Sequence, residues 1–262
     1  MKTREQAVEG IPDFWQRVRG ERRRFLAVDY DGTLAPFRTE RMKAVPVRGT
    51  IPLLSQIAAD GSTRLVIVSG RPVSELRALL GPLAVEMVGV HGFEYGDGQG
   101  CLRQTEPDRI QKEGLEEAFR RVLRAGFPAA SLERKSASLV FHTRGWPHGE
   151  DSADRVRQLW FPLAERHGLF VQEFNGGIEL RADGVNKGTA LLEFLKTESE
   201  GPLVIYIGDD ETDEDAFGAI SSFGIGIKVG AEGETTKAKG RLPGCTAVRE
   251  FLRTWRRMTE AP

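Results

Sequence analysis

The chain alternates short apolar runs with segments of helical spacing, and this pattern constrains its fold more than any other feature. Strand-like apolar runs lie within residues 25–28, 64–70, 85–92, 202–210 and 224–230. Helical patterns lie within residues 11–23, 50–60, 72–81, 186–198 and 211–221, with Pro72 predicted as the first residue of its helix. Apolar strands that alternate with helices favour a parallel sheet covered on both faces. The sequence therefore predicts an α/β core of Rossmann-like type.

The middle of the chain breaks this alternation. It carries a helical pattern over 108–126, short alternating strands over 131–144, a second helix over 154–166 and a strand pair over 169–182. Asn175-Gly176-Gly177 is typical of the turn of a β-hairpin. We therefore predict an inserted α+β cap domain at 97–182, within a core made of residues 1–96 and 183–262.

Two carboxylates follow the first apolar run, Phe25 to Val28. Asp29 and Asp31 stand one residue apart, followed by Gly32 and Thr33. Like charges so close resist joint ionisation, and a buried strand gains nothing from them. We therefore expect a positive group or ion at this position.

Other predicted strand and helix ends carry polar side chains as well. They are Ser69, Gly70 and Arg71 after the second strand, Lys187 before a helix, and Asp209, Asp210 and Asp213 after a later strand. In open parallel sheets, ligands gather beyond the carboxyl ends of the strands, so these groups are expected to converge. Oxygen ligands without cysteine or histidine indicate Mg²⁺ rather than zinc.

Such a set of groups suits phosphoryl transfer. A carboxylate that attacks phosphorus forms an aspartyl-phosphate. A second acid nearby can protonate the leaving alcohol and then activate water. Mg²⁺, Lys187 and the Ser69 hydroxyl would neutralise the phosphoryl oxygens.

Each feature alone has an ordinary interpretation, such as a surface turn, a solvated lysine or an acidic helix N-terminus. A calcium-binding loop is excluded because Leu34 stands where that loop requires glycine. A phospho-acceptor signalling domain also uses clustered acids, a hydroxyl and a lysine. Its acceptor aspartate, however, lies on a later strand than its acidic pair, and it has no insert.

The order DYDGT, SGR, a lysine before a helix, and GDDETD resembles the haloacid dehalogenase superfamily of phosphatases, and the insert resembles its C2-type cap. Within that superfamily the chain is most similar to the trehalose-6-phosphate phosphatase family. The motifs shared with that family are H-G-x-E at His91–Glu94, E-x-K at Glu133 and Lys135 followed by Ser138, H-x-R at His142 and Arg144, and E-x-R at Glu179 and Arg181. The chain departs from the family pattern at Thr143, Ala182, Val185 and Asn186.

This resemblance implies a role for each matching residue. Asp29 would be the nucleophile and Asp31 the general acid and base. Ser69, Gly70, Arg71 and Lys187 would bind the phosphoryl group, and Mg²⁺ would be held by Asp29, the Asp31 carbonyl and Asp209, supported by Asp213. The cap residues Glu133, Lys135, His142, Arg144, Glu179 and Arg181 would contact the sugar. Trehalose 6-phosphate is the expected substrate, with a functional link to trehalose-6-phosphate synthase; sucrose phosphate and mannosyl-3-phosphoglycerate are the alternatives.

The cap pattern agrees with a polar binding face. Glu133 and Lys135 are two residues apart on a predicted strand, so they point to one side of it. Carboxylates and a lysine on one face suit the many hydroxyls of a sugar. Their ordinary interpretation is an exposed ion pair.

The composition excludes several other partners. The formal net charge is -1, so neither nucleic acid nor an acidic membrane surface is an expected partner. The longest apolar runs are far shorter than a membrane helix requires. Only Cys101 and Cys245 occur, without metal-site spacing, and we expect two isolated thiols in a cytoplasmic protein.

Overall fold

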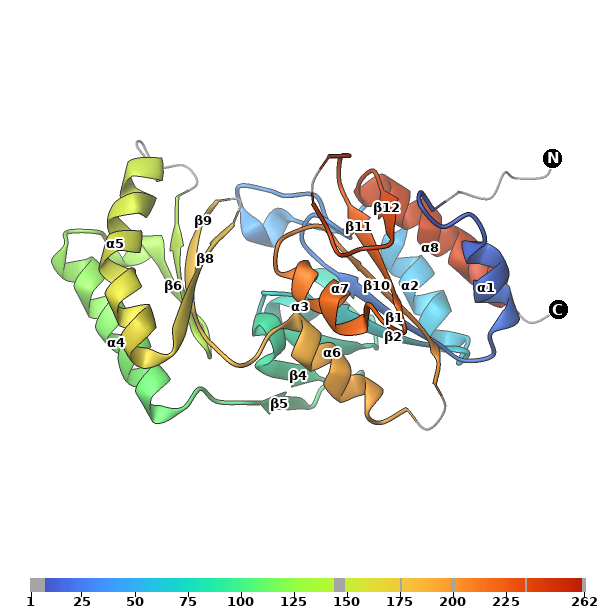
Figure 1. Cartoon of the computed structure of the whole chain (residues 1–262), viewed down its shortest axis with the longest axis horizontal. Coiled ribbons are helices and arrows are strands. Elements are labelled where there is room, and N and C mark those ends of the chain that lie inside the picture. The colour runs from blue at the N-terminus through green and yellow to red at the C-terminus, as the bar shows by residue number, and fades with distance from the viewer. Residues whose placement is uncertain (1–7, 144–148, 175, 199–200, 234, 261–262) are drawn as a thin grey trace. The chain divides into compact units, whose positions relative to one another are not determined.

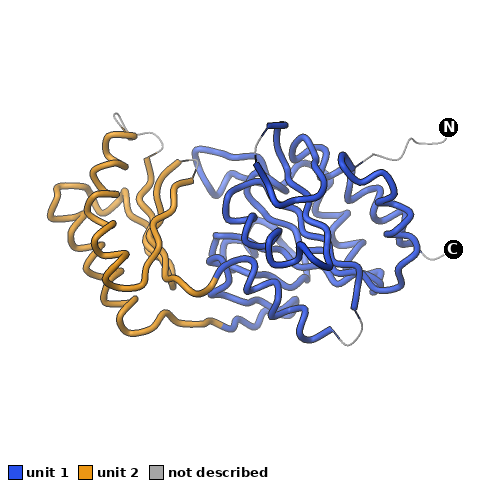
Figure 2. Tube along the Cα trace, in the orientation of Figure 1, with its two compact units in different colours: residues 1–103, 186–262 blue, residues 104–185 orange. Residues whose placement is uncertain are grey.

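The computed structural model describes residues 8–143, 149–174, 176–198, 201–233 and 235–260. The chain divides into two compact units, one made of residues 1–103 and 186–262 and the other of residues 104–185 (Figure 2). We call them the core unit and the cap unit. The domain boundaries predicted from the sequence, after residue 96 and before residue 183, stay predictions.

The core unit is built on a mostly parallel sheet. The described residues form an eight-stranded sheet, in the order β12-β11-β10-β1-β2-β3-β4-β5. Neighbouring strands from β12 to β3 run parallel, and β4 pairs antiparallel with β3. The strands are β1 (Arg24–Asp29), β2 (Thr63–Val68), β3 (Glu86–Gly89), β4 (Glu94–Gly96), β5 (Leu102–Gln104), β10 (Leu203–Gly208), β11 (Ile225–Val229) and β12 (Gly240–Leu242).

Helices cover both faces of this sheet (Figure 1). One apolar cluster joins the sheet to α1 (Phe14–Gly20), α2 (Thr50–Ala59), α3 (Val73–Leu80) and α8 (Cys245–Thr259). A second cluster, on the other face, joins it to α6 (Lys187–Leu195) and α7 (Asp213–Ile220). Every residue of β1 and β10 is buried, as expected of a sheet covered on both sides.

The cap unit has two layers. Its sheet has the order β6-β7-β9-β8, and α4 and α5 pack on one face (Figure 1). Its elements are α4 (Arg109–Arg124), β6 (Leu132–Arg134), β7 (Ser138–His142), α5 (Gly149–His167), β8 (Leu169–Phe174) and β9 (Gly177–Ala182). Trp160 and Leu163 of α5 and Phe141 and Leu180 of the sheet are fully buried. The hairpin prediction is confirmed by the antiparallel pairing of β8 with β9, although Asn175 lies outside the described residues.

The predicted fold class, an α/β core with an inserted α+β cap, is confirmed. Two local details differ from the prediction. Pro72 precedes α3 as its N-cap and is not its first residue. The sequence reading also missed α8, whose Phe251 packs on Phe14 and Trp15 of α1, with ring centroids 5.4 and 5.0 Å apart.

Two further observations concern the cysteines and the length of the apolar helices. Cys101 and Cys245 are free thiols. Among the helices within the described residues, none has the length and apolar composition needed to span a membrane.

Candidate active site

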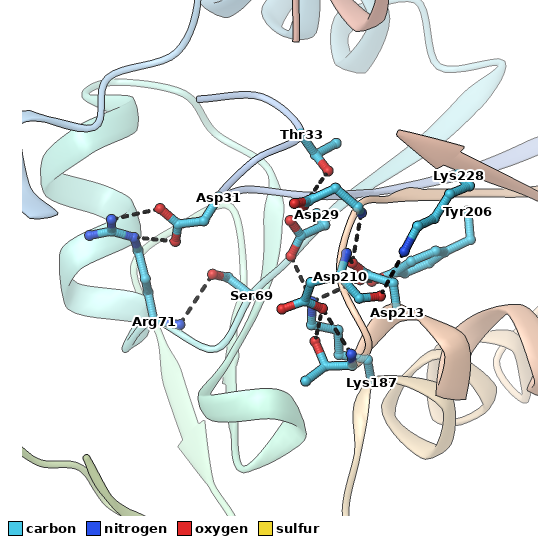
Figure 3. Close-up of polar contacts among 12 residues, drawn as sticks. Asp29, Asp31, Thr33, Ser69, Arg71, Lys187, Tyr206, Asp210, Asp213 and Lys228 are labelled. Carbon is cyan, nitrogen blue, oxygen red and sulfur yellow. Dashed lines mark hydrogen bonds and ion pairs between the residues drawn. The ribbon is translucent and has the colours of Figure 1, made fainter. Parts of the chain in front are cut away.

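The strand ends of the core unit bring the predicted polar residues together (Figure 3). Asp29 ends β1, and its register partner in β2 is Val68, the residue before Ser69. Asp209 follows directly on Gly208, the last residue of β10. Because β10, β1 and β2 are parallel neighbours, all three polar side chains lie at the same edge of the sheet.

Lys187 joins this group from the first residue of α6. Asn186 caps the helix: its side chain accepts a hydrogen bond from the Thr189 N–H at 2.8 Å, and the Thr189 hydroxyl oxygen accepts one from the Asn186 N–H at 3.0 Å. This capping box fixes where the helix begins. The Lys187 ammonium donates to Asp29 Oδ1 and Asp213 Oδ1, both at 2.8 Å, and the residue is 2% exposed.

Asp213 anchors the loop that carries Asp209 and Asp210. Its Oδ2 accepts hydrogen bonds from the N–H groups of both residues, at 2.9 and 3.0 Å. Its Oδ1 accepts from the Tyr206 hydroxyl at 2.6 Å as well as from Lys187. Gly208 leaves the space for this carboxylate, since a Cβ there would lie 2.2 Å from its carbon. Asp213 therefore holds the backbone of the loop that carries Asp209 and Asp210, and it is itself one of the clustered carboxylates.

The carboxylate of Asp31 is directed away from this cluster, toward Arg71 (Figure 3). Arg71 donates two hydrogen bonds to it, at 2.6 and 2.7 Å, and the Arg71 N–H donates to Ser69 Oγ at 3.1 Å. A bidentate pair of this kind fixes the plane of the carboxylate. Arg71, predicted as a phosphate ligand, thus has Asp31 as its partner in this structure.

The loop between Asp29 and Thr33 requires a glycine. Gly32 has φ +77°, and a Cβ there would meet the Asp209 carboxylate. The Thr33 hydroxyl donates to Asp209 Oδ1 at 3.0 Å, and the Cys245 thiol donates to the Gly32 carbonyl at 3.1 Å. The sequence reasoning assigned no role to Thr33, Cys245 or Tyr206. Thr33 could have been found from its place in the DYDGT motif, but no local pattern points to the other two.

The H-G-x-E segment supports the Ser69–Arg71 loop from behind. His91 has φ +55° and lies against Gly70, where a Cβ would come within 2.5 Å of its Nε2. The Glu94 carboxylate accepts a hydrogen bond from the Val73 N–H at 2.8 Å, at the start of α3. Gly70 therefore serves close packing on His91. The segment shapes the loop that presents Ser69.

Burial dominates the electrostatics of the acidic cluster. It raises the pKa of Asp29 well above its usual value, although Lys187 opposes the shift. It also raises the pKa of Asp209 to about 8, with Asp213 and Asp210 adding to the effect. Burial alone would lower the pKa of Lys187, but Asp213 and Asp29 outweigh it and raise that pKa. One lysine therefore does not balance these carboxylates, and the cluster favours a further cation.

Three carboxylates are placed to hold such a cation. Ligand atoms of Asp29, Asp209 and Asp213 all lie within 4.8 Å of one another. They are oxygen donors only, which suits Mg²⁺ better than a metal that prefers nitrogen or sulfur ligands. The side chain of Asp31 is not in this group, so its predicted part in a metal site would fall to its backbone carbonyl.

The cap unit gathers the other predicted residues on one face of its sheet. Opposite residues on paired strands share a face, and the register places Glu133, Val140 and Glu179 in one row and Ser138 and Arg181 in the next. Lys135 donates to Glu179 Oε1 at 3.0 Å and the Ser138 hydroxyl donates to the same atom at 2.5 Å. His142 Nε2 lies 2.8 Å from Glu133 Oε2. Arg144 lies outside the described residues.

Comparisons with known proteins show the family to which this chain belongs. The model of the trehalose-phosphatase family matches residues 27–243. The chain is 31% identical to trehalose-6-phosphate phosphatase of Escherichia coli over 234 residues, covering 86% of this chain and 83% of that protein. It is 33% identical to a bifunctional trehalose-6-phosphate synthase/phosphatase of Thermoproteus tenax, covering 88% of this chain but only 32% of that protein.

A solved structure shares the fold over the whole chain. The C-terminal domain of trehalose-6-phosphate phosphatase from C. albicans superposes with a TM-score of 0.81 at 23% identity, covering 99% of each chain. At that identity the likeness speaks for the fold alone.

Proposed function

Since this chain belongs to the trehalose-phosphatase family and is thus a phosphoric monoester hydrolase, we propose that it hydrolyses trehalose 6-phosphate to trehalose and phosphate through an aspartyl-phosphate. The observation that carries the reaction is the buried cluster of Asp29, Lys187 and Asp213 at the strand ends. The substrate is supported by family membership and by the polar face of the cap sheet.

Asp29 is the nucleophile in this proposal. Its Oδ1 is held by Lys187, while its Oδ2 accepts no hydrogen bond from any other residue that the structure describes. Oδ2 is therefore the oxygen that attacks phosphorus: a bond forms between it and phosphorus as the bond from phosphorus to the sugar oxygen breaks. Lys187 keeps the carboxylate oriented and adds positive charge beside the phosphoryl group.

Asp31 moves the proton. It protonates the departing sugar oxygen, and in the second step it takes a proton from the water that attacks the acyl-phosphate. That water returns Asp29 as a carboxylate and releases inorganic phosphate. Arg71 holds the Asp31 carboxylate in one plane through both of its oxygens, so Asp31 must release one of these hydrogen bonds and turn toward the substrate before it carries the proton. In this proposal the Ser69 hydroxyl, whose oxygen accepts from the Arg71 N–H, donates to a phosphoryl oxygen.

In this proposal Mg²⁺ is the further cation that the acidic cluster favours. Asp29, Asp209 and the Asp31 carbonyl would hold it, and Asp213 would keep Asp209 in place through the backbone of the loop. When bound, it neutralises charge on the phosphoryl oxygens. Asp209 is suited to this because Thr33 orients its carboxylate and burial disfavours its ionised form unless a cation is present.

A functional link to a synthase follows from the proposed substrate. The relative in Thermoproteus tenax bears the name of both activities in one chain, and the present chain matches about a third of it. We infer that this protein consumes the product of a trehalose-6-phosphate synthase, as the last step of trehalose formation.

Phosphate release from a panel of esters tests the proposal. The panel contains trehalose 6-phosphate, sucrose phosphate, mannosyl-3-phosphoglycerate and glucose 6-phosphate, each assayed with Mg²⁺ and with a chelator. We expect kcat/KM for trehalose 6-phosphate to exceed the others by about 10²-fold or more, since unmatched polar groups penalise wrong sugars. Activity should disappear with the chelator. A preference for another ester would refute the substrate, and full activity without divalent metal would refute the Mg²⁺ site.

A further inference from the structure

Strand β8 contributes three side chains to the polar face of the cap sheet that no motif assigns. Phe170 is paired with Arg181, Gln172 with Glu179 and Phe174 with Gly177, so the first two share the face of the predicted sugar contacts, and Phe174 continues their alternation. We call Phe170, Gln172 and Phe174 the β8 strip.

Gln172 stands out because the oxygen of its side-chain amide has no hydrogen-bond partner among the described residues. The residue is 8% exposed, and its Oε1 is enclosed yet accepts no hydrogen bond from the described part of the chain. Buried polar groups are nearly always satisfied, so an exception needs an explanation. Its cross-strand neighbour Glu179 differs, since it accepts from both Lys135 and Ser138. The amide therefore lies on the face of the predicted sugar contacts with its oxygen unsatisfied among the described residues.

Phe174 presents a flat apolar surface next to this amide. The residue is 37% exposed, and its ring lies across Gly177, whose absent side chain leaves the room. It meets the His142 ring edge-to-face, with centroids 6.3 Å apart and an interplanar angle of 86°. Phe170 flanks the amide on the other side, with the Arg181 guanidinium 5.3 Å from its ring centroid. Neighbours on the same face therefore hold both rings in place.

Exposure of an aromatic ring alone would mean little. Phe161 of α5 is 58% exposed without any such surroundings, and single exposed apolar residues are common in proteins. The β8 strip differs because its two rings flank an unsatisfied amide on a polar sheet face. Sites for small molecules combine aromatic surface with a few placed polar groups in this way.

We propose that the β8 strip is a sugar-binding subsite. The Phe174 ring packs against the C–H face of a hexose, and the Gln172 amide hydrogen-bonds to one of its hydroxyls. The last side-chain torsion of glutamine is broad, so a rotation there lets either Oε1 or Nε2 face the ligand. The inference rests on the proposed function, because it deepens the contact between the cap and a sugar phosphate.

Two substitutions test the strip in the full-length chain. In Gln172→Leu and Phe174→Ala, kcat/KM for the best sugar phosphate should fall about tenfold, mainly through a higher KM. Hydrolysis of a small aryl phosphate should stay unchanged, because it needs only the core unit. Phe161→Ala is the matched control and should leave both substrates unaffected. Equal losses on both substrates, or no loss on the sugar phosphate, would overturn the subsite.

Thermal unfolding separates binding from a structural role. Leucine is apolar and comparable in size to glutamine, although it branches one carbon earlier, and it removes the unsatisfied Oε1, so Gln172→Leu should have an equal or higher Tm. A lower Tm with proportional loss on both substrates would mean that Gln172 supports the fold, which overturns the proposal.

The same assay distinguishes failure of the proposed substrate from failure of the β8 strip. Each variant is measured with the sugar phosphate that the wild-type protein hydrolyses best, so failure of trehalose 6-phosphate as substrate refutes the proposed function and leaves the β8 strip under test. If the wild-type protein favours no sugar phosphate over the aryl ester, the strip is refuted as well.

Discussion

The core site and the polar face of the cap are built by different rules. In the core, functional side chains come from the ends of strands and the first residues of helices, and they are deeply buried: Lys187 is 2% exposed and Asp213 0%. In the cap, they come from alternate residues of strands, and their exposure is mixed: Glu179 is 6% exposed, whereas the side chain of His142 is 36% exposed. Burial suits a site that must strengthen charge interactions, whereas an alternating sheet face suits a site that must present many groups at once.

The two regions also differ in charge balance. The core cluster sets several carboxylates against Lys187, so it favours a further cation. In the cap, the described pairs balance charge locally, since Lys135 is paired with Glu179 and His142 with Glu133. A sugar that binds these charged groups must therefore exchange hydrogen bonds with them, whereas Gln172 Oε1 has none to give up among the described residues. We therefore expect substitutions in the core to lower the hydrolysis of every phosphate ester, and substitutions in the cap to lower only that of sugar phosphates.

The largest expected effect comes from the nucleophile. Asp29→Asn should reduce phosphate release on the order of 10⁴-fold or more, because an amide cannot form the acyl-phosphate. The loss should be the same for trehalose 6-phosphate and for a small aryl phosphate, measured as kcat/KM. Asp60→Asn, at the end of α2, is the control. Substantial turnover by Asp29→Asn would disprove the mechanism.

The cap should respond selectively. Glu179→Ala should lower kcat/KM for trehalose 6-phosphate by about 10²-fold, since it removes a proposed sugar contact and the hydrogen bond that Lys135 donates to it. The aryl phosphate should be hydrolysed at nearly the wild-type rate. Glu173→Ala is the matched control, because Glu173 lies on the same hairpin but on the opposite face of the sheet. A uniform loss on both substrates would erase the proposed difference between the regions.

Metal binding should depend on pH through the buried acids. The pKa of Asp209 is raised to about 8 in the metal-free protein, so below that pH a bound proton must leave before the carboxylate can bind Mg²⁺. The apparent affinity should therefore weaken about tenfold per unit as the pH falls below about 8. Calorimetric titration across this range measures it. An affinity independent of pH would show that Asp209 is already ionised.

The smallest effect concerns the orientation of the proton donor. Arg71→Lys keeps the charge but loses the two parallel hydrogen bonds to Asp31. We expect kcat to fall roughly threefold to tenfold on both substrates, because the carboxylate is less well oriented. Arg249→Lys, at a partly exposed pair with Glu250, serves as control. A loss confined to trehalose 6-phosphate would assign Arg71 to the sugar and not to the core chemistry.

The sequence by itself determined the architecture and most of the candidate core residues. Apolar strands alternating with helices required a covered parallel sheet, and parallel strands bring their carboxyl ends to one edge. The convergence of Asp29, Ser69 and Asp209 follows from that rule without any knowledge of contacts. The α8 helix could have been predicted as well, since its apolar residues have helical spacing; they are Val248, Phe251, Leu252 and Trp255.

Only the tertiary structure decided which partners these residues take. Arg71 lies beside Asp31, Tyr206 donates to Asp213, and Gln172 Oε1 has no hydrogen-bond partner in the described part of the chain. No local pattern encodes such pairings, because they depend on the positions of atoms from segments far apart in the chain. The pKa values depend on them too, since desolvation is a property of the packed interior. Periodicity in a sequence specifies faces and edges, whereas contacts across them arise only when the chain is folded.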